Sequence, residues 1–108
     1  MEPLINVKQP EVKNFIGGEF IRNEQPSMDI ESPLTGEIIS TLPISSTKDL
    51  NDAVEAAKEA FPVWSAWTLK ERVQIFYSYR NLLEKNLDEL ARLVQLENGK
   101  IYSEAKAE

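Results

Sequence analysis

The spacing of apolar residues changes once along this chain, and this change constrains the fold more than any other feature. Before residue 46, apolar residues come in short β-prone runs separated by turn residues, which is the pattern of strands. From Leu50 to Trp64, apolar residues recur at intervals of three and four, as on one face of an α-helix. Strands followed by helices predict an α+β fold. The 108 residues suit one domain, expected to span residues 12–108 after a flexible lead-in at residues 1–11.

Two β-hairpins are expected in the first half of the chain. In the first, residues 14–16 and 19–21 flank Gly17-Gly18, and glycine permits the positive φ angles of a type I′ turn. The second is expected to pair residues 28–31 with residues 37–42 through a Pro- and Gly-containing turn. Gly17-Gly18 is not followed by a helix start or by a further spaced glycine, so a phosphate-binding loop is the weaker interpretation of this pair.

The first helix is expected to begin with a cap at Ser46 or Thr47. Pro62 disfavours helical geometry at the residue before it and lacks an amide donor. The helix should therefore end or kink there, and residues 63–67 would form a corner.

A second helical region begins at Thr68, where Thr68 and Glu71 have the spacing of a capping box. Its apolar stripe is long enough for one helix or for two helices joined at Asn86. A second capping box between Asn86 and Glu89 favours two. Residues 98–108 carry an Asn-Gly stop signal and then the opening of a further helix. The hairpins are thus followed by two to three α-helices.

The sequence contains no cysteine and no histidine. It therefore cannot supply a thiolate nucleophile, a disulfide, a zinc site of the Cys/His type or a Ser-His-Asp triad. The net charge of −6 argues against a nucleic-acid surface, which needs a basic stripe. No export signal and no run of 18 apolar residues is present, so a cytoplasmic location without membrane contact is expected.

Carboxylates are the remaining candidates for chemistry. Glu71 with a neighbour, or Asp88 with Glu89, could form an acid–base pair, which would make the chain an independent carboxylate enzyme. The helix dipole gives a sufficient structural reason for acids in a first helical turn. Trp64 and Trp67 could stack on a ligand, but apolar residues at helical spacing more often pack in a core.

Five motifs follow one another along the chain: Phe15–Ile21, Ser32–Ile39, Ala53–Ala57, Ala60–Trp64 and Leu96–Lys100. Together they resemble the N-terminal segment of the aldehyde dehydrogenase superfamily, and the resemblance covers residues 14–108. Residues 61–65, 75–79 and 104–108 look most like methylmalonate-semialdehyde dehydrogenases, the coenzyme A-acylating branch. Ser32 is a departure, because many members have Asn before this proline.

The resemblance implies an enzyme that oxidises an aldehyde with NAD or NADP through a cysteine nucleophile and, in this branch, passes the acyl group to coenzyme A. In the family, the catalytic and cofactor-binding residues lie beyond the segment that this chain matches. No catalytic and no cofactor-binding residue, and no bound cofactor, is therefore expected here.

The chain is expected to be an N-terminal fragment that is inactive alone and acts as scaffolding, namely the outer hairpins and first helices of an α/β cofactor-binding domain. Its expected partner is the remainder of the dehydrogenase subunit. The alternative is a stand-alone interaction module that associates with itself or with a full-length subunit, because unpaired strands and apolar helix faces need cover.

The resemblance also implies one metal site. Many members hold a structural cation with backbone carbonyls just before the Ser-Pro turn and with an acid ahead of Asn-Gly-Lys. The matching positions are Ile30, Glu31 and Glu97. Oxygen ligands suit hard cations, but Glu97 is equally well explained as a surface acid at a helix end.

Overall fold

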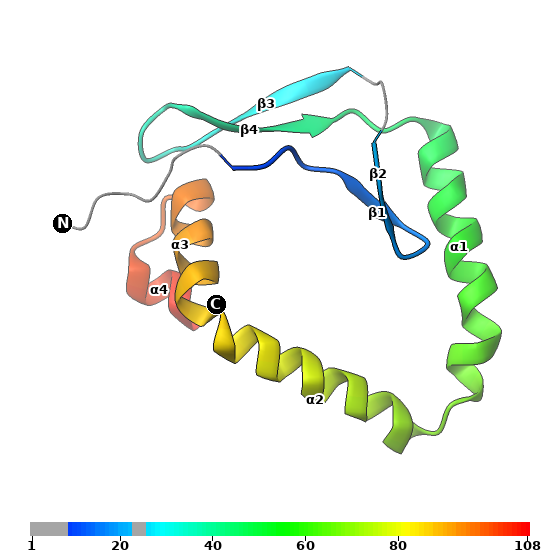
Figure 1. The fold of residues 1–108 in the computed structure, drawn as a ribbon. Helices are drawn as coiled ribbons and strands as arrows, with labels where there is room; N and C mark the ends of the chain where they lie inside the picture. Colours follow the sequence, from blue (N-terminus) through cyan, green and yellow to red (C-terminus); the bar gives the residue numbers. More distant parts are fainter. Residues whose placement is uncertain (1–8, 23–25) are drawn as a thin grey trace.

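The structure of this protein is a computed structural model that describes residues 9–22 and 26–108. Within these residues the strands precede the helices, as expected (Figure 1). The strands are β1 (Asn14–Ile16), β2 (Glu19–Ile21), β3 (Ser27–Glu31) and β4 (Ile38–Pro43). The helices are α1 (Thr47–Ala66), α2 (Leu69–Lys85), α3 (Leu87–Asn98) and α4 (Tyr102–Ala107).

Strands β1 and β2 form the first hairpin, which confirms its prediction. Gly17 and Gly18 both have positive φ angles, of 62° and 85°, as a type I′ turn requires. Phe15 and Phe20 are directly opposite each other, and their ring centroids are 5.0 Å apart. This aromatic pair adds a cross-strand contact to a hairpin of only three residues a strand.

Strands β3 and β4 form the second hairpin, with an irregularity between Ile30 and Glu31. The return strand begins one residue later than expected, because the Glu37 amide donates to Thr35 Oγ1 at 3.2 Å inside the turn. Pro43 is its last residue, in keeping with a proline that cannot donate to a ladder.

The expected lead-in, residues 1–11, lies largely outside the described residues, which begin at Gln9. From Gln9 the chain follows β4. The Gln9 amide donates to Ile39 O at 2.6 Å, and the Val12 amide donates to Thr41 O at 2.9 Å. Ser40 Oγ also donates to Pro10 O at 2.7 Å. These bonds cover the outer edge of β4.

Helix α1 does not end at Pro62, so the corner expected over residues 63–67 is wrong. Proline has a φ angle compatible with a helix and removes a single backbone bond, so the flanking turns carry the helix onward. It ends at the extended cap residue Trp67, whose amide donates to Trp64 O at 3.2 Å. The corner is therefore confined to Trp67 and Thr68.

The joint between α2 and α3 lies at Asn86, as expected. The predicted capping box of Asn86 with Glu89 is wrong, since the Asn86 side chain makes no cap bond to α3. Its Nδ2 instead donates back to Leu82 O at 2.8 Å and closes the end of α2. The predicted cap of α1 is confirmed at Ser46, which forms a capping box with Asp49, and the predicted capping box of Thr68 with Glu71 is confirmed.

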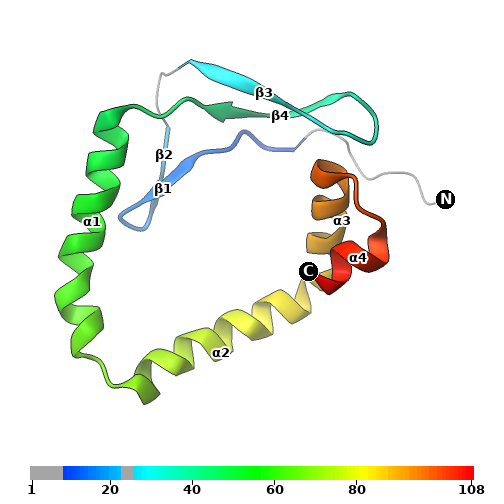
Figure 2. The same cartoon turned by 180° about the vertical axis from the view of Figure 1, so that it is seen from behind.

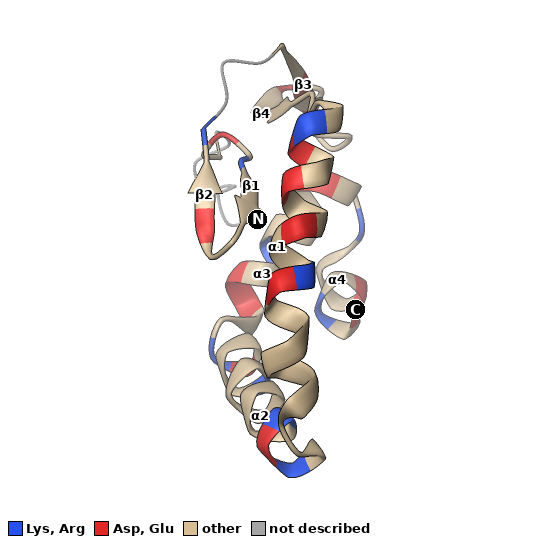
Figure 3. Ribbon diagram, turned by 90° about the vertical axis from the view of Figure 1, so that its right-hand side faces the viewer, with Lys and Arg blue, Asp and Glu red and all other residues tan. Residues whose placement is uncertain are grey.

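The elements form an open frame instead of stacked layers (Figures 1 and 2). The hairpins make one side, and α1, α2 and the α3–α4 pair make the others. Seen edge-on, the frame is thin (Figure 3), with extents of 50 × 36 × 17 Å. The radius of gyration is 17.4 Å, whereas a compact chain of this length has about 13 Å.

Buried apolar residues are few in the described part of the chain: Ile39, Ala91, Leu96 and Ala105. The helical stripe that the spacing places toward an interior is largely uncovered, with Phe61 66% and Phe76 60% exposed. The amphipathic pattern is present, but the elements of this chain do not cover it.

Candidate functional site

The most enclosed polar group of the described residues lies where the β3–β4 turn meets the end of α3. We call this contact the turn–helix junction and define it as residues 32–36 against residues 95–99. Ser32 is 1% exposed, and its Oγ donates to Leu96 O at 2.5 Å. The same Oγ accepts from the Leu34 amide at 3.3 Å. One hydroxyl therefore links two segments 64 residues apart.

The backbone of the turn holds Ser32 in place. The Ser32 amide donates to Glu37 O at 2.9 Å, and the Gly36 amide donates to Ser32 O at 2.8 Å. With both backbone groups bonded and the side chain bonded to α3, Ser32 leaves no polar group unsatisfied in a buried position.

Gly99 forms the other side of the junction. It caps α3 with a left-handed φ of 84°, and its amide donates to Gln95 O at 2.9 Å. A Cβ at this position would lie 3.3 Å from Pro33 Cγ. Glycine is thus favoured here by the positive φ angle and by the close approach of the turn.

The residues proposed for a structural cation flank this junction. Glu31 immediately precedes Ser32, and Glu97 immediately follows Leu96, so the Ser32–Leu96 bond brings the two segments to one place. Glu31 and Glu97 are exposed, and Ile30 is half-buried. No cluster of three acidic, histidine or cysteine side chains occurs in the described residues. The cation site therefore stays a prediction that depends on backbone carbonyls and on further ligands.

Asp88 links α3 to α4 instead of pairing with Glu89. Tyr102 Oη donates to Asp88 Oδ1, and Lys106 Nζ lies 3.7 Å from the same oxygen. The Tyr102 hydrogen bond, followed by the Lys106 charge, lowers the pKa of Asp88 below its ordinary value of 3.8. A carboxyl held ionised in this way is a structural anchor and a poor general acid.

Glu71 is occupied by the cap of α2. Its Oε2 accepts from the Thr68 amide at 2.7 Å and from Thr68 Oγ1 at 2.9 Å. The backbone bond, and then the hydroxyl bond, lower the pKa of Glu71 below 4.5. Glu71 lies in the first turn of α2, whereas Asp88 lies in the first turn of α3, beyond the joint at Asn86. Both carboxylates are engaged in structural hydrogen bonds.

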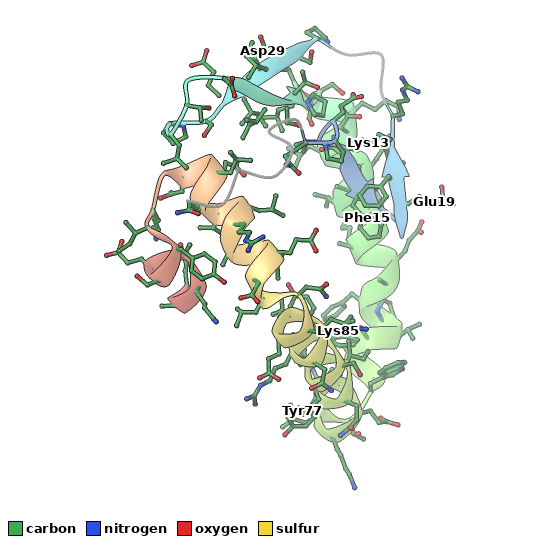
Figure 4. The ribbon with its side chains drawn as sticks, turned by 60° about the vertical axis from the view of Figure 1, so that its left-hand side comes forward. Lys13, Phe15, Glu19, Asp29, Tyr77 and Lys85 are labelled. Atoms are coloured by element: carbon green, nitrogen blue, oxygen red, sulfur yellow. The ribbon has the colours of Figure 1, made fainter. Side chains whose placement is uncertain are left out.

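An open hollow of about 260 Å³ lies between α1 and β1, the strand that carries Phe15 (Figure 4). Its one carboxylate, Asp49, accepts from the Ser46 amide at 2.7 Å and caps α1. Asn14 Nδ2 donates to Ser45 Oγ at 2.8 Å. These polar groups are engaged in structure, so this hollow has no arrangement suited to catalysis.

Two features of these sites were not predictable from the pattern of residues. Ser32 has the sequence context of an ordinary turn residue, and its one distinguishing signal is that many members of the family have Asn at this position. The hydrogen bond from Tyr102 to Asp88 joins residues on two helices, and no local spacing of residues predicts it.

The sequence profile of the aldehyde dehydrogenase family matches residues 20–108. A curated relative, malonate-semialdehyde dehydrogenase 2 of Oceanobacillus iheyensis, is 45% identical over 98 residues, or 90% of this chain. This chain spans about a fifth of that relative, 20% of its length. No helix in residues 9–22 and 26–108 meets the length and hydropathy needed to cross a bilayer.

Solved structures agree with the sequence match. The methylmalonate-semialdehyde dehydrogenase of Oceanimonas doudoroffii superposes with a TM-score of 0.86 at 32% identity, over 92% of this chain and 20% of that one. The NADP-dependent glyceraldehyde-3-phosphate dehydrogenase of Bacillus halodurans, solved with NADP, gives 0.87 at 26% identity, over 92% and 21%. The resemblance to the N-terminal segment of the superfamily, and to its semialdehyde branch, is confirmed.

Proposed function

Because this chain belongs to the aldehyde dehydrogenase family, we propose that it is the N-terminal scaffold of an NAD- or NADP-dependent semialdehyde dehydrogenase subunit. Methylmalonate or malonate semialdehyde is the proposed substrate class of the whole enzyme, by analogy with the names of its relatives. The chain contributes no catalysis by itself in this proposal. Coenzyme A as acyl acceptor and a cytoplasmic location belong to the same proposal.

One observation carries the proposal. The frame leaves large apolar side chains uncovered on both long helices, while its relatives are about five times as long. Soluble monomers rarely expose contiguous apolar surface of this kind. The remaining four fifths of a dehydrogenase subunit would supply the cover.

The residues present do not build a dinucleotide site. Gly17 and Gly18 join two antiparallel strands, whereas a pyrophosphate loop joins a strand to a helix N-terminus. The family's cysteine nucleophile also has no counterpart, because the sequence contains no cysteine. Cofactor binding and aldehyde oxidation are therefore assigned to the remainder of the subunit.

A split-enzyme experiment tests this proposal. The chain is produced alone and together with the C-terminal four fifths of the Oceanobacillus iheyensis relative, and NADH formation from malonate semialdehyde is followed at 340 nm. We expect no activity from either piece alone and measurable activity from the pair. A chain that oxidises the aldehyde alone would contradict the scaffold role.

A chimera provides a second arm that does not depend on assembly of two pieces. Residues 20–108 of this chain replace the matching segment in the full-length relative, which is expected to remain folded and active. A chimera and a split pair that are both inactive would overturn the proposed function.

The second candidate function is a stand-alone interaction module that binds copies of itself. The same exposed apolar surface favours it, together with the open edges of the short β1–β2 hairpin. Size-exclusion chromatography with light scattering separates the two candidates. A stable dimer that does not exchange with the remainder of the dehydrogenase would support the module, whereas a complex with the remainder would support the scaffold.

A further inference from the structure

The corner between α1 and α2 combines partly exposed aromatic rings with an arginine whose Nε atom is buried. We call it the corner patch and define it as Trp64, Trp67, Arg72 and Phe76. Trp64 and Trp67 close the end of α1, while Arg72 and Phe76 lie four residues apart on α2 and so share one face of that helix.

The aromatic side chains contact one another without being enclosed. The Trp64 ring centroid lies 5.8 Å from that of Trp67 and 6.5 Å from that of Phe76. Trp67 remains 41% exposed and Phe76 60% exposed. Partly exposed aromatic rings, together with an arginine on the same helix face as one of them, have the composition of the centre of a protein interface.

Arg72 adds an unpaired hydrogen-bond donor to this corner. Its Nε is buried and is the one side-chain polar atom in the described residues that is buried without a hydrogen-bond partner. Buried donors in folded proteins are nearly always bonded, and a guanidinium is suited to carbonyl and carboxylate oxygens. The Nε of Arg72 therefore lacks a hydrogen-bond acceptor, and the aromatic rings of the patch lack apolar cover.

We propose that the corner patch docks the remainder of the dehydrogenase subunit and that Arg72 receives from it a carbonyl or carboxylate oxygen. This inference rests on the proposed function. The occupant follows from the length of the relatives, four fifths of which lies outside this chain. A second copy of the chain is the poorer occupant, because each copy carries a net charge of −6.

The test compares two arginines on the same helix. Arg72→Gln removes the charge of the patch, whereas Arg80→Gln is the matched control, since Arg80 is exposed and its Nε bonds to Glu84 at 3.1 Å within α2. Affinity-tagged chain is co-expressed with the remainder of the Oceanobacillus iheyensis enzyme, and the amount of remainder recovered is measured. Circular dichroism checks that each variant keeps the helicity of the original chain.

We expect Arg72→Gln to lower recovery of the remainder about tenfold or more, the effect of losing a hydrogen bond to a charged group. Arg80→Gln is expected to change it less than twofold. The same pair of substitutions in the chimera gives a second readout, in which Arg72→Gln lowers the melting temperature and Arg80→Gln does not.

Equal effects of the two substitutions would overturn the role of Arg72 while leaving the proposed function intact. Loss of self-association, but not of binding to the remainder, on Arg72→Gln would identify a second copy as the occupant and would also overturn it. If the unsubstituted chain assembles neither in the split pair nor in the chimera, the proposed function fails and this inference fails with it.

Discussion

The two halves of the helical region are held in different ways. Helices α3 and α4 contain the buried residues Ala91, Leu96 and Ala105, and they contact the turn of the second hairpin through Ser32. Helix α2 has no buried residue at all, and the single buried residue of α1 is the capping Asp49.

Helices α1 and α2 are supported by interactions close in sequence. Each begins with a capping box, and ion pairs one turn apart lie along their exposed faces, such as Lys48–Asp52 and Arg80–Glu84. Helix α3 lacks a side-chain N-cap and depends on contacts from distant residues instead. A strong local helix signal therefore does not show whether the apolar face of the helix is covered within the same chain.

The largest expected effect is on α3. Leu96→Ala should lower the free energy of unfolding by about 3 kcal/mol, because it removes a side chain that is 5% exposed and leaves a cavity. Urea denaturation followed by circular dichroism measures this. Leu82→Ala on the exposed face of α2 is the control and should cost less than about 1 kcal/mol. Equal losses would remove the distinction between the two helices.

Ser32→Ala should cost about 2 kcal/mol, since it deletes a buried hydrogen bond and leaves Leu96 O without its donor. The same denaturation experiment measures the loss. Ser78→Ala, at an exposed position of α2, is the control and should be within about 0.5 kcal/mol of the original chain. A neutral Ser32→Ala would show that the turn–helix junction does not hold the frame together.

Gly99→Ala should lower the free energy of unfolding by about 1–2 kcal/mol, because of the left-handed φ at this position and the nearby Pro33 ring. Gly36→Ala is a matched control, because Gly36 has a φ of 71° but nothing lies within 4 Å of an added Cβ. The difference between the two melting temperatures isolates the contact with Pro33. No difference would mean that the strain is purely local.

The smallest expected effect concerns acid pH. The pKa of Glu71 is lowered by its bonds from Thr68, so its contribution to α2 is complete above the ordinary value of 4.5 and is lost as pH falls through the lowered value. Helicity measured at 222 nm should fall in this range, and Glu71→Gln should reduce the pH-dependent part. Glu59→Gln, at an exposed position of α1, is the control and should leave it unchanged. An identical acid response in the Glu71 and Glu59 variants would exclude the cap as its source.

Local signals in the sequence located most elements of this fold. Turn glycines, capping boxes and the change of period place the hairpins and helices, because each acts over a few residues. Pro62 was misleading, since a proline inside a helix removes one backbone hydrogen bond and the helical turns on either side of it can compensate for this loss. Asn86 was misleading because it lies between the end of α2 and the start of α3, and its side chain bonds to a carbonyl of α2 instead of an amide of α3.

The candidate sites depend on distant contacts and were less predictable. No residue close in sequence to Ser32 predicts its hydrogen bond to Leu96, and none near Arg72 indicates that its Nε lacks a partner. The sequence shows the apolar stripe of α2 and predicts that it packs in a core, but α2 has no buried residue in this structure. Periodicity identifies which face of a helix is apolar, and only the folded arrangement shows what covers it.

Hydrogen–deuterium exchange reports on both halves of the helical region at once, and so compares the support of α2 with that of α3 in one experiment. The amides of α2 and α3 are compared in the chain alone and in its complex with the remainder of the Oceanobacillus iheyensis enzyme. We predict that α2 exchanges faster than α3 in the chain alone and becomes strongly protected in the complex. An α2 that is protected as well as α3 in the isolated chain, or is unchanged by the remainder, would contradict the account.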